Sequence, residues 1–186
     1  MEIDVNNVNT MAIRVNPVSL GFGRNRDIQL EGYFQDLGFP YKFWLNIPFE
    51  AETYLWVARG PPKCSGDSLE LVTGALCGYK TLDNGFHIEY IAARKNCKKM
   101  RIGEALMKQA LTDMKEELKI KTVTLSAVDQ YLPLFYAKFG FNTTELRGSI
   151  TAMEKRFGGR IHTRRSVRKS RRRFTRSAGR SRKQRT

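Results

Sequence analysis

His87 and Glu89 carry side chains that can take up a proton near neutral pH, and they stand two positions apart in the segment FHIEYIAA. Alternate residues of a β-strand point to the same face, so this spacing predicts that the two side chains lie together. An imidazole has an unperturbed pKa of about 6.5, which suits a general base. We therefore take His87 as the candidate base and Glu89 as its reserve. The alternative for His87 is a structural role in the core.

A cluster of positive charge follows in the segment ARKNCKKMRIGEAL, which contains Lys95, Lys98, Lys99 and Arg101 and runs into an amphipathic pattern. The first backbone N–H groups of a helix are unpaired and carry the positive end of its dipole, so such a place binds phosphate. The segment is neither a Walker A loop nor a dinucleotide fingerprint. Its alternative interpretation is a solvated basic loop that only begins a helix.

The cysteines and histidines do not form a metal-binding pattern. Cys64, Cys77 and Cys97 are odd in number and widely separated, which predicts no disulfide framework and favours a reducing compartment. Cys97 lies among lysines that would favour its thiolate, but a structural role is the stronger interpretation because no histidine lies near it in sequence. The two histidines, His87 and His162, complete no metal site with these cysteines.

The elements that must position these residues alternate between strand and helix patterns. The best local prediction is a β-hairpin of residues 71–81 and 86–93, joined by a tight Asn-Gly turn at Asn84. Apolar residues four apart between Arg101 and Lys119 predict an amphipathic helix. We also expect strands at 10–15, 54–60, 122–128 and 148–157, a short helix at 131–139, and one or two short helices within 20–50. This order predicts an α+β domain with a β-α-β crossover.

Positive charge is concentrated at the carboxyl end of the chain. Of 186 residues, 33 are Lys or Arg and 18 are Asp or Glu, but residues 158–186 hold 13 of the bases and no acid. Residues 1–157 therefore form a nearly neutral domain, and 158–186 a tail too polar to fold alone. Such a tail favours binding of nucleic acid or another polyanion, or nuclear import, over a merely solvated charge run.

The chain also lacks any stretch of about 20 apolar residues, the length that spans a bilayer. We therefore expect a soluble intracellular protein with no membrane partner. The basic tail points to the nucleus or to an assembly that contains nucleic acid.

Several weak motifs in order carry a family resemblance. The block FHIEYIAARKNCKKMRIGEALMKQAL, then FYAKFGF and AMEKRF, resembles the GCN5-related N-acetyltransferase (GNAT) superfamily. The family's signature loop, Gln/Arg-x-x-Gly-x-Gly/Ala, opens a helix, and its later aromatic-Tyr-x-x-x-Gly-Phe run is matched by Phe135, Tyr136, Gly140 and Phe141. The resemblance covers residues 72–157, and 11–60 only by the order of elements.

The resemblance implies a mostly antiparallel sheet flanked by helices, an α/β sandwich that splays open between the strands at 86–93 and 122–128. Acetyl-CoA would lie in that gap and transfer its acetyl group to a primary amine by direct attack, with no metal. Tyr136 aligns with the family's tyrosine that protonates the departing thiolate, although a buried core aromatic is its alternative role. His87 falls where the histone-acetylating branch has its catalytic glutamate.

The same resemblance implies a set of cofactor-binding residues. The pantetheine arm would follow the backbone near Tyr90, Ile91, Ala92 and Ala93, and the pyrophosphate would lie on Lys98, Lys99, Met100, Arg101, Ile102 and Gly103, with Glu104 beside them. Asp129 stands where many members carry an asparagine and joins this set; like Ser126, it would also line the acceptor side.

Three residues of the loop depart from the family pattern. Lys98 replaces Gln or Arg, Arg101 replaces the first glycine, and Glu104 replaces a small neutral residue. A left-handed conformation at Arg101 would cost roughly 1–2 kcal/mol, while its guanidinium could clamp a phosphate. The competing hypothesis is therefore a non-enzymatic nucleic-acid-binding protein that uses a GNAT-like scaffold. The acceptor remains open among protein lysines or N-termini, polyamines and other small amines.

Overall fold

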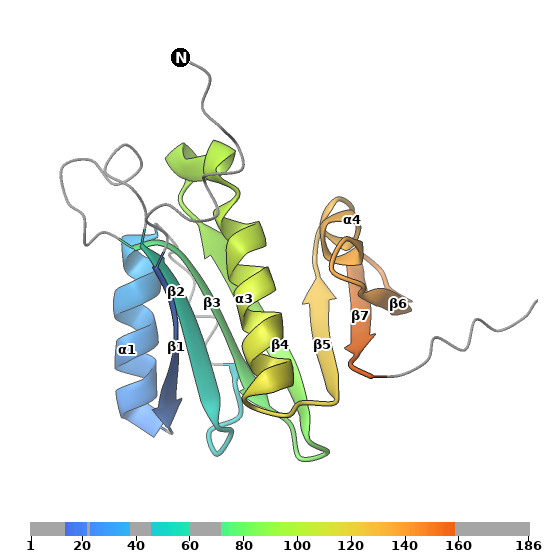
Figure 1. Ribbon diagram of the computed structural model, residues 1–186, viewed down its shortest axis with the longest axis horizontal. Helices are drawn as coiled ribbons and strands as arrows, with labels where there is room; N and C mark the ends of the chain where they lie inside the picture. The colour runs from blue at the N-terminus through green and yellow to red at the C-terminus, as the bar shows by residue number, and fades with distance from the viewer. Residues whose placement is uncertain (1–13, 22, 38–45, 60–71, 159–186) are drawn as a thin grey trace, which may run out of the picture.

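A single sheet of seven strands organises the chain in a computed structural model, which describes residues 14–21, 23–37, 46–59 and 72–158 (Figure 1). The strand order is β1-β2-β3-β4-β5-β7-β6, and all neighbours are antiparallel except β4 and β5. The strands are β1 (Arg14–Gly21), β2 (Thr53–Arg59), β3 (Val72–Lys80), β4 (Gly85–Ala93), β5 (Thr122–Ala127), β6 (Asn142–Arg147) and β7 (Ile150–Arg156). The helices are α1 (Gly23–Asp36), the 3₁₀ helix η3 (Lys95–Met100), α3 (Ile102–Glu116) and α4 (Leu132–Ala137). The predicted α+β class and the mixed sheet are confirmed.

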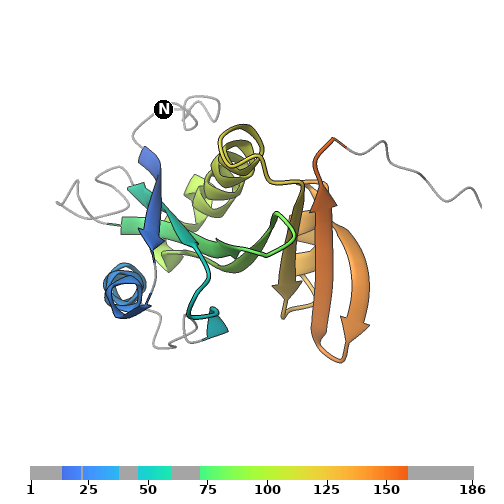
Figure 2. The ribbon, with the colours of Figure 1, turned by 90° about the horizontal axis from the view of Figure 1, so that it is seen from below.

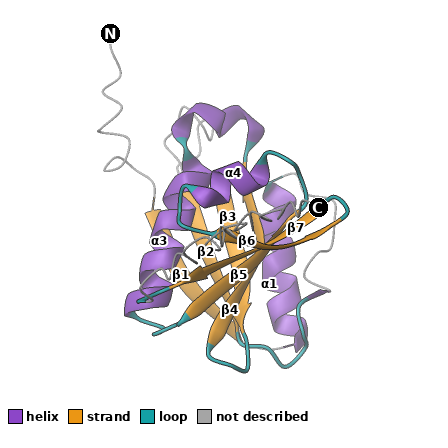
Figure 3. Ribbon diagram, turned by 90° about the vertical axis from the view of Figure 1, so that its right-hand side faces the viewer, coloured by secondary structure: helices purple, strands orange, loops and turns teal. Residues whose placement is uncertain are grey.

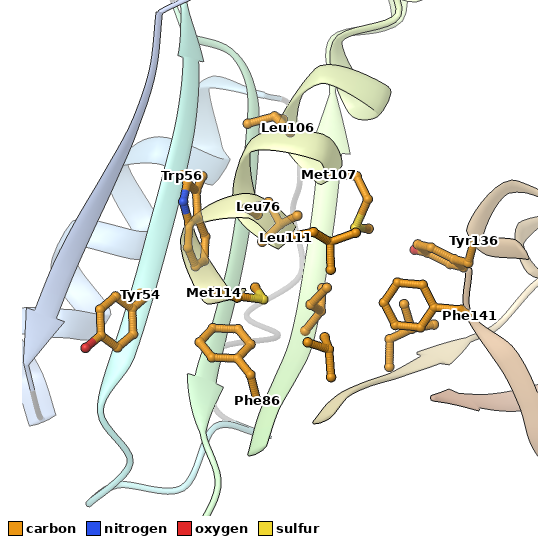
Figure 4. Close-up of a cluster of buried hydrophobic side chains, with 14 of the residues drawn as sticks. Tyr54, Trp56, Leu76, Phe86, Leu106, Met107, Leu111, Met114, Tyr136 and Phe141 are labelled. Carbon is orange, nitrogen blue, oxygen red and sulfur yellow. The ribbon is translucent and has the colours of Figure 1, made fainter. Parts of the chain in front are cut away.

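Helices cover both faces of the sheet. Figures 2 and 3 show α1 on one side of the strands and α3 on the other. Leu30 and Phe34 of α1 pack in one apolar cluster with Leu55 of β2. The larger cluster, drawn in Figure 4, joins α3 and α4 to the opposite face and contains Trp56 and Tyr136. The result is the predicted sandwich, with two cores separated by the sheet.

Helix α3 is fixed to the sheet by a buried polar contact. The indole Nε1 of Trp56 on β2 donates to Asp113 Oδ2 at 2.7 Å, and Gln109 Nε2 donates to the other oxygen at 2.7 Å. The helix was predicted to reach Lys119 but ends at Glu116. Lys119 has a φ of 54°, which turns the chain towards β5.

Helix α1 is a single 14-residue helix, where the sequence predicted one or two short ones. Its buried face contains Arg26 as well as Leu30 and Phe34. Arg26 Nη1 donates to the carbonyl oxygen of Pro48 at 3.0 Å, and the guanidinium pairs with Asp27. A charged residue in the buried stripe hides the helical apolar period, which explains the weak sequence signal.

Two further predictions need correction, and one strand was missed. Residues 81–84 form the hairpin loop, wider than a two-residue turn, because the N–H of Thr81 bonds the carbonyl of Gly85 and Asn84 adopts a φ of 60°. The first strand was expected at 10–15 but is β1; residues 10–13 lie outside the described residues. Strand β6 was not predicted, because all six of its side chains are exposed and give no apolar alternation.

Candidate active site

Strands β4 and β5 separate halfway along their length. They pair from Gly85 with Thr122 to Ile88 with Leu125, whereas β4 continues to pair with β3 as far as Ala93. The divergence is visible in Figure 1, where the upper ends of the two strands move apart. The predicted opening between residues 86–93 and 122–128 is therefore present, bounded by the second half of β4.

A β-bulge shapes β4 at this opening. The register with β3 passes from Gly78 opposite Ile88 to Cys77 opposite Tyr90, which leaves Glu89 as the extra residue. A Cβ on Gly78 would lie 2.2 Å from the carbonyl oxygen of His87, so the close approach needs glycine. The bulge helps to place His87 Nε2 3.6 Å from Glu89 Oε2.

His87 is held on its other side by β5. Its Nδ1 lies 2.9 Å from the Thr124 hydroxyl oxygen, and that hydroxyl donates to the Phe86 carbonyl at 3.5 Å. The imidazole is thus held between Thr124 on its Nδ1 side and Glu89 on its Nε2 side. Burial lowers the pKa of His87 below its ordinary value, so the imidazole is neutral at pH 7 and can accept a proton.

Glu89 is partly buried beside this imidazole. Burial raises the pKa of its carboxyl group, and a hydrogen bond from Asn46 opposes that rise. Among the residues that the structure describes, no lysine or arginine forms an ion pair with Glu89. Tyr79 completes the surroundings, with its ring centre 5.4 Å from that of His87. Within the described part of the chain, the carboxyl group of Glu89 thus has no fixed cation.

Tyr136 approaches from the other face of the sheet. It is buried on α4 between the rings of Phe135, at 5.2 Å, and Phe141, at 6.1 Å, and its hydroxyl points towards β4 and α3 (Figure 4). Burial, and secondarily the nearby Tyr90 of β4, raise the pKa of Tyr136 to about 12. Its phenol is therefore protonated at neutral pH and can act as an acid.

The loop before α3 carries an unusual backbone conformation. Arg101 has φ 53° and ψ 32°, so it adopts the left-handed conformation whose cost was considered above for this position. Its Nη2 lies 2.5 Å from Glu104 Oε2, and Lys108 Nζ lies 3.3 Å from the other oxygen of Glu104. These two ion pairs outweigh the cost of burial and lower the pKa of Glu104. The carboxylate is thus tied to two cations at the start of the helix.

A cavity of about 290 Å³ joins this loop to the end of β4. Its lining includes the start of α3 and, from α4, the ring of Phe135. The lining residues are Ala93, Arg94, Cys97, Arg101, Ile102, Gly103, Glu104 and Phe135. Several residues predicted to hold a pyrophosphate therefore line one cavity.

Comparison with protein families identifies this arrangement. Residues 68–151 match the model of the acetyltransferase (GNAT) domain. These residues form a GNAT domain, as in acyl-CoA-dependent acetyltransferases. A search of curated proteins found no match to the chain.

Solved structures share the fold of this GNAT domain at low sequence identity. A protein from Lactobacillus plantarum, described as an N-acetyltransferase, superposes with a TM-score of 0.57 at 13% identity, covering 78% of this chain and 98% of that one. Escherichia coli ElaA gives a TM-score of 0.52 at 18% identity, with coverages of 76% and 99%. A Klebsiella pneumoniae protein described as an acyl-CoA N-acyltransferase gives 0.53 at 12% identity, with coverages of 76% and 97%.

The remaining residues that the sequence predicted for the site have the following places in the structure. Ile91 and Met100 pack against the larger apolar cluster, and the side chains of Lys98 and Lys99 lie outside the described residues. Asp129 is exposed and accepts a hydrogen bond at 2.9 Å from the backbone N–H of Tyr131, so it caps the turn into α4. Ser126 is exposed on β5.

The prediction about the cysteines was wrong. Cys97 is buried and disulfide-bonded, and Cys77 is the free cysteine among the described residues. A sulfur in a disulfide cannot be the thiolate nucleophile considered for Cys97. The prediction of a reducing compartment assumed unpaired cysteines, so the disulfide at Cys97 removes its support.

Sequence reasoning missed Thr124, Tyr79 and Asn46, which surround the His87 and Glu89 pair. They come from other elements, and only the fold brings them close. Within the described residues, no group of three His, Cys, Asp or Glu side chains is arranged to hold a metal ion. No helix there is long and apolar enough to span a membrane.

Proposed function

We propose that this GNAT domain transfers an acetyl group from acetyl-CoA to a primary amine, with His87 as the base and Tyr136 as the acid. The observation that carries the proposal is the separation of β4 from β5 just beyond Ile88, next to His87 on β4, with the Tyr136 hydroxyl of α4 directed towards β4. His87 and Tyr79 lie on the face that α1 covers, whereas Tyr136 belongs to the cluster under α3 and α4. The acceptor would thus approach from the α1 face and the thioester from the other.

The residues around the cavity fit a CoA thioester. The N-terminal amides of α3 and the Arg101 guanidinium offer hydrogen bonds to a diphosphate, and the end of β4 lies beside them. Beyond Ile88 the edge of β4 is not paired with β5, so Tyr90, Ile91, Ala92 and Ala93 can take an extended pantetheine arm. Family membership and this fit support acetyl-CoA as the cosubstrate.

The pKa values of His87 and Tyr136 determine which group accepts a proton and which group donates one. An alkyl amine has a pKa of about 10.4 and arrives protonated. The ammonium group first loses one proton to water, and the neutral amine nitrogen then attacks the acetyl carbon. Nε2 of His87 accepts the second proton that the nitrogen loses after this bond has formed. As the C–S bond breaks, the Tyr136 hydroxyl donates its proton to the sulfur and regains one from water. Glu89, close to the imidazole, stabilises the positive charge that His87 gains.

The Glu89 carboxyl group beside His87 indicates the class of acceptor. The partly buried carboxyl of Glu89 has no fixed cation among the described residues, so an ammonium group of the acceptor complements it. Protein lysines or N-termini, polyamines and other small amines all meet this requirement.

We propose separate roles for the two parts of the chain. Residues 1–157 would act as the catalytic domain, and the Arg-rich residues 158–186 would bind nucleic acid or direct nuclear import. Such binding would be independent of sequence and strongly weakened by salt.

A second candidate is a non-enzymatic nucleic-acid-binding protein on a GNAT scaffold. The ion pair between Arg101 and Glu104 favours it, because a carboxylate at the cofactor cavity opposes an anionic ligand. Calorimetric titration of the full chain with CoA separates the two candidates. Saturable binding supports the enzyme, and absence of binding by the folded chain supports the scaffold.

A further inference from the structure

A second cavity, of about 600 Å³, lies between α3 and the end of β7 and shares no lining residue with the cofactor cavity. We call it the basic groove. Four of its lining side chains are cations and one is an acid, Glu116. The lining residues are Lys108, Leu111, Thr112, Lys115, Glu116, Phe139, Lys155, Arg156, Phe157 and Gly158.

Lys155 is a partly buried cation in the lining of the basic groove. Its ammonium donates to the carbonyl oxygen of Phe139 at 2.5 Å and lies 5.5 Å from the centre of the Phe157 ring. Burial, and then the neighbouring Lys115, lower the pKa of Lys155. Two cations thus approach each other where water is partly excluded, an unfavourable arrangement unless an anion joins them.

Lys115 and Lys155 also lack counter-ions among the side chains that the structure describes. Within the described residues neither Lys115 nor Lys155 forms an ion pair with an acid, whereas Lys108 pairs with Glu104 and Arg156 with Glu154. An anionic ligand would therefore meet Lys115 and Lys155 without displacing an acidic partner.

The shape and the aromatic rings indicate an extended ligand. Lys108 and Lys115 lie seven residues apart on α3, about 10 Å along its axis, so the cations form a line. Phe139 and Phe157 contribute partly buried rings to the same groove. A positively charged groove with aromatic side chains is typical of proteins that bind single-stranded nucleic acid, whose unpaired bases can stack.

The position of the groove connects it to the basic tail. Gly158, the last described residue, belongs to its lining, and residues 159–186 continue from there with 13 Lys or Arg and no acid. We propose that the basic groove binds single-stranded nucleic acid, so that the folded domain and the tail hold the same strand. This inference rests on the proposed role of the tail and adds a specific surface of the domain to it.

The test measures salt dependence on the full chain. Binding of a fluorescent 20-residue oligothymidylate is followed by anisotropy over a range of KCl concentrations, for wild type and for the double variant Lys115→Gln, Lys155→Gln. Each lost phosphate contact reduces the slope of log affinity against log salt by about 0.7, so the double variant should lose about 1.4. The control Arg24→Gln removes an exposed cation on α1, across the sheet, and should keep the wild-type slope.

The outcomes separate this inference from the proposals on which it rests. If wild type binds the oligonucleotide and the double variant keeps the wild-type slope, the groove alone is overturned. No binding by wild type overturns the role of the tail as well. Should the double variant fail to fold, 4-thiothymidine cross-linking of wild type decides: cross-links at Phe139 or Phe157 support the groove, and cross-links confined to 159–186 refute it.

Discussion

The Nε2 of His87 lies 3.6 Å from the Oε2 of Glu89 across the bulge in β4. Burial lowers the pKa of the imidazole and raises that of the carboxyl group. The two values therefore move towards each other, and the imidazole remains the stronger candidate for a base that is neutral at pH 7.

This relationship predicts the pH dependence of acetyl transfer. The base must be unprotonated, so kcat/KM should fall as pH falls through the His87 pKa, which lies below the ordinary 6.5. Activity should thus be independent of this group at pH 7 and above. A pH profile of thiol release on a small amine checks it. An inflection that lies above 7 but below the pKa of the free amine, and that persists in His87→Ala, would assign the base elsewhere.

Substitution of the base should separate chemistry from binding. Removal of a general base typically costs 10²–10⁴-fold, so His87→Ala should lower kcat at least about 100-fold while CoA affinity stays unchanged. Thr124→Val removes the bond that orients the ring and should lower kcat less, with KM for CoA unchanged. Steady-state kinetics and calorimetry measure both effects. Normal turnover in His87→Ala would exclude the assigned role.

The acid role of Tyr136 has a matched control in Tyr131. Tyr136→Phe keeps the ring packing with Phe135 and Phe141 but removes the proton donor, so kcat should fall about 10²-fold. Tyr131→Phe changes an exposed tyrosine just before the same helix and should keep wild-type kcat. Equal rates for Tyr136→Phe and wild type would leave Tyr136 with a packing role.

Glu104 is expected to weaken cofactor binding. Glu104→Gln removes an anion from the cavity and releases the Arg101 guanidinium, so CoA should bind about two- to fivefold more tightly. The control Glu116→Gln removes an exposed acid farther along α3 and should leave CoA affinity unchanged. Calorimetric titration of both variants measures the change. Weaker binding by Glu104→Gln would show that the carboxylate helps to build the site.

Gly78 should be required for both stability and turnover. A Cβ there meets backbone at 2.2 Å, so Gly78→Ala must displace β3 or β4 at the bulge and should lower the free energy of unfolding by about 1–3 kcal/mol. Gly32→Ala on α1 meets nothing within 4 Å and should be neutral or stabilise by up to about 1 kcal/mol. Urea unfolding compares the two variants. Equal stability would mean that the bulge adapts to a side chain.

Much of the fold around the site was predictable, because its apolar pattern is regular. The period of four along α3 places Leu106 and Met114 in the core, and the β3-β4 hairpin follows from two apolar runs around Asn84. Helix α1 was poorly predicted since Arg26 lies in its buried stripe. Strand β6 was missed because its exposed side chains follow no apolar period.

The candidate site was only partly predictable for a different reason. Strand alternation predicted that His87 and Glu89 lie on the same face. The bulge opposite Gly78, which shapes their strand, depends on the register between β3 and β4, and no local sequence pattern shows that register. Thr124 reaches His87 from a strand 37 residues away. Such long-range contacts leave no periodic signal in the sequence.

The central claim is tested most directly by thiol release from acetyl-CoA by the full chain, measured across a panel of protein lysines, N-terminal peptides, polyamines and small amines. We predict amine-dependent release of one thiol for each acetylated amine, abolished in the double variant His87→Ala, Tyr136→Phe. A correctly folded chain that neither binds CoA nor releases thiol with any of these amines would contradict the account.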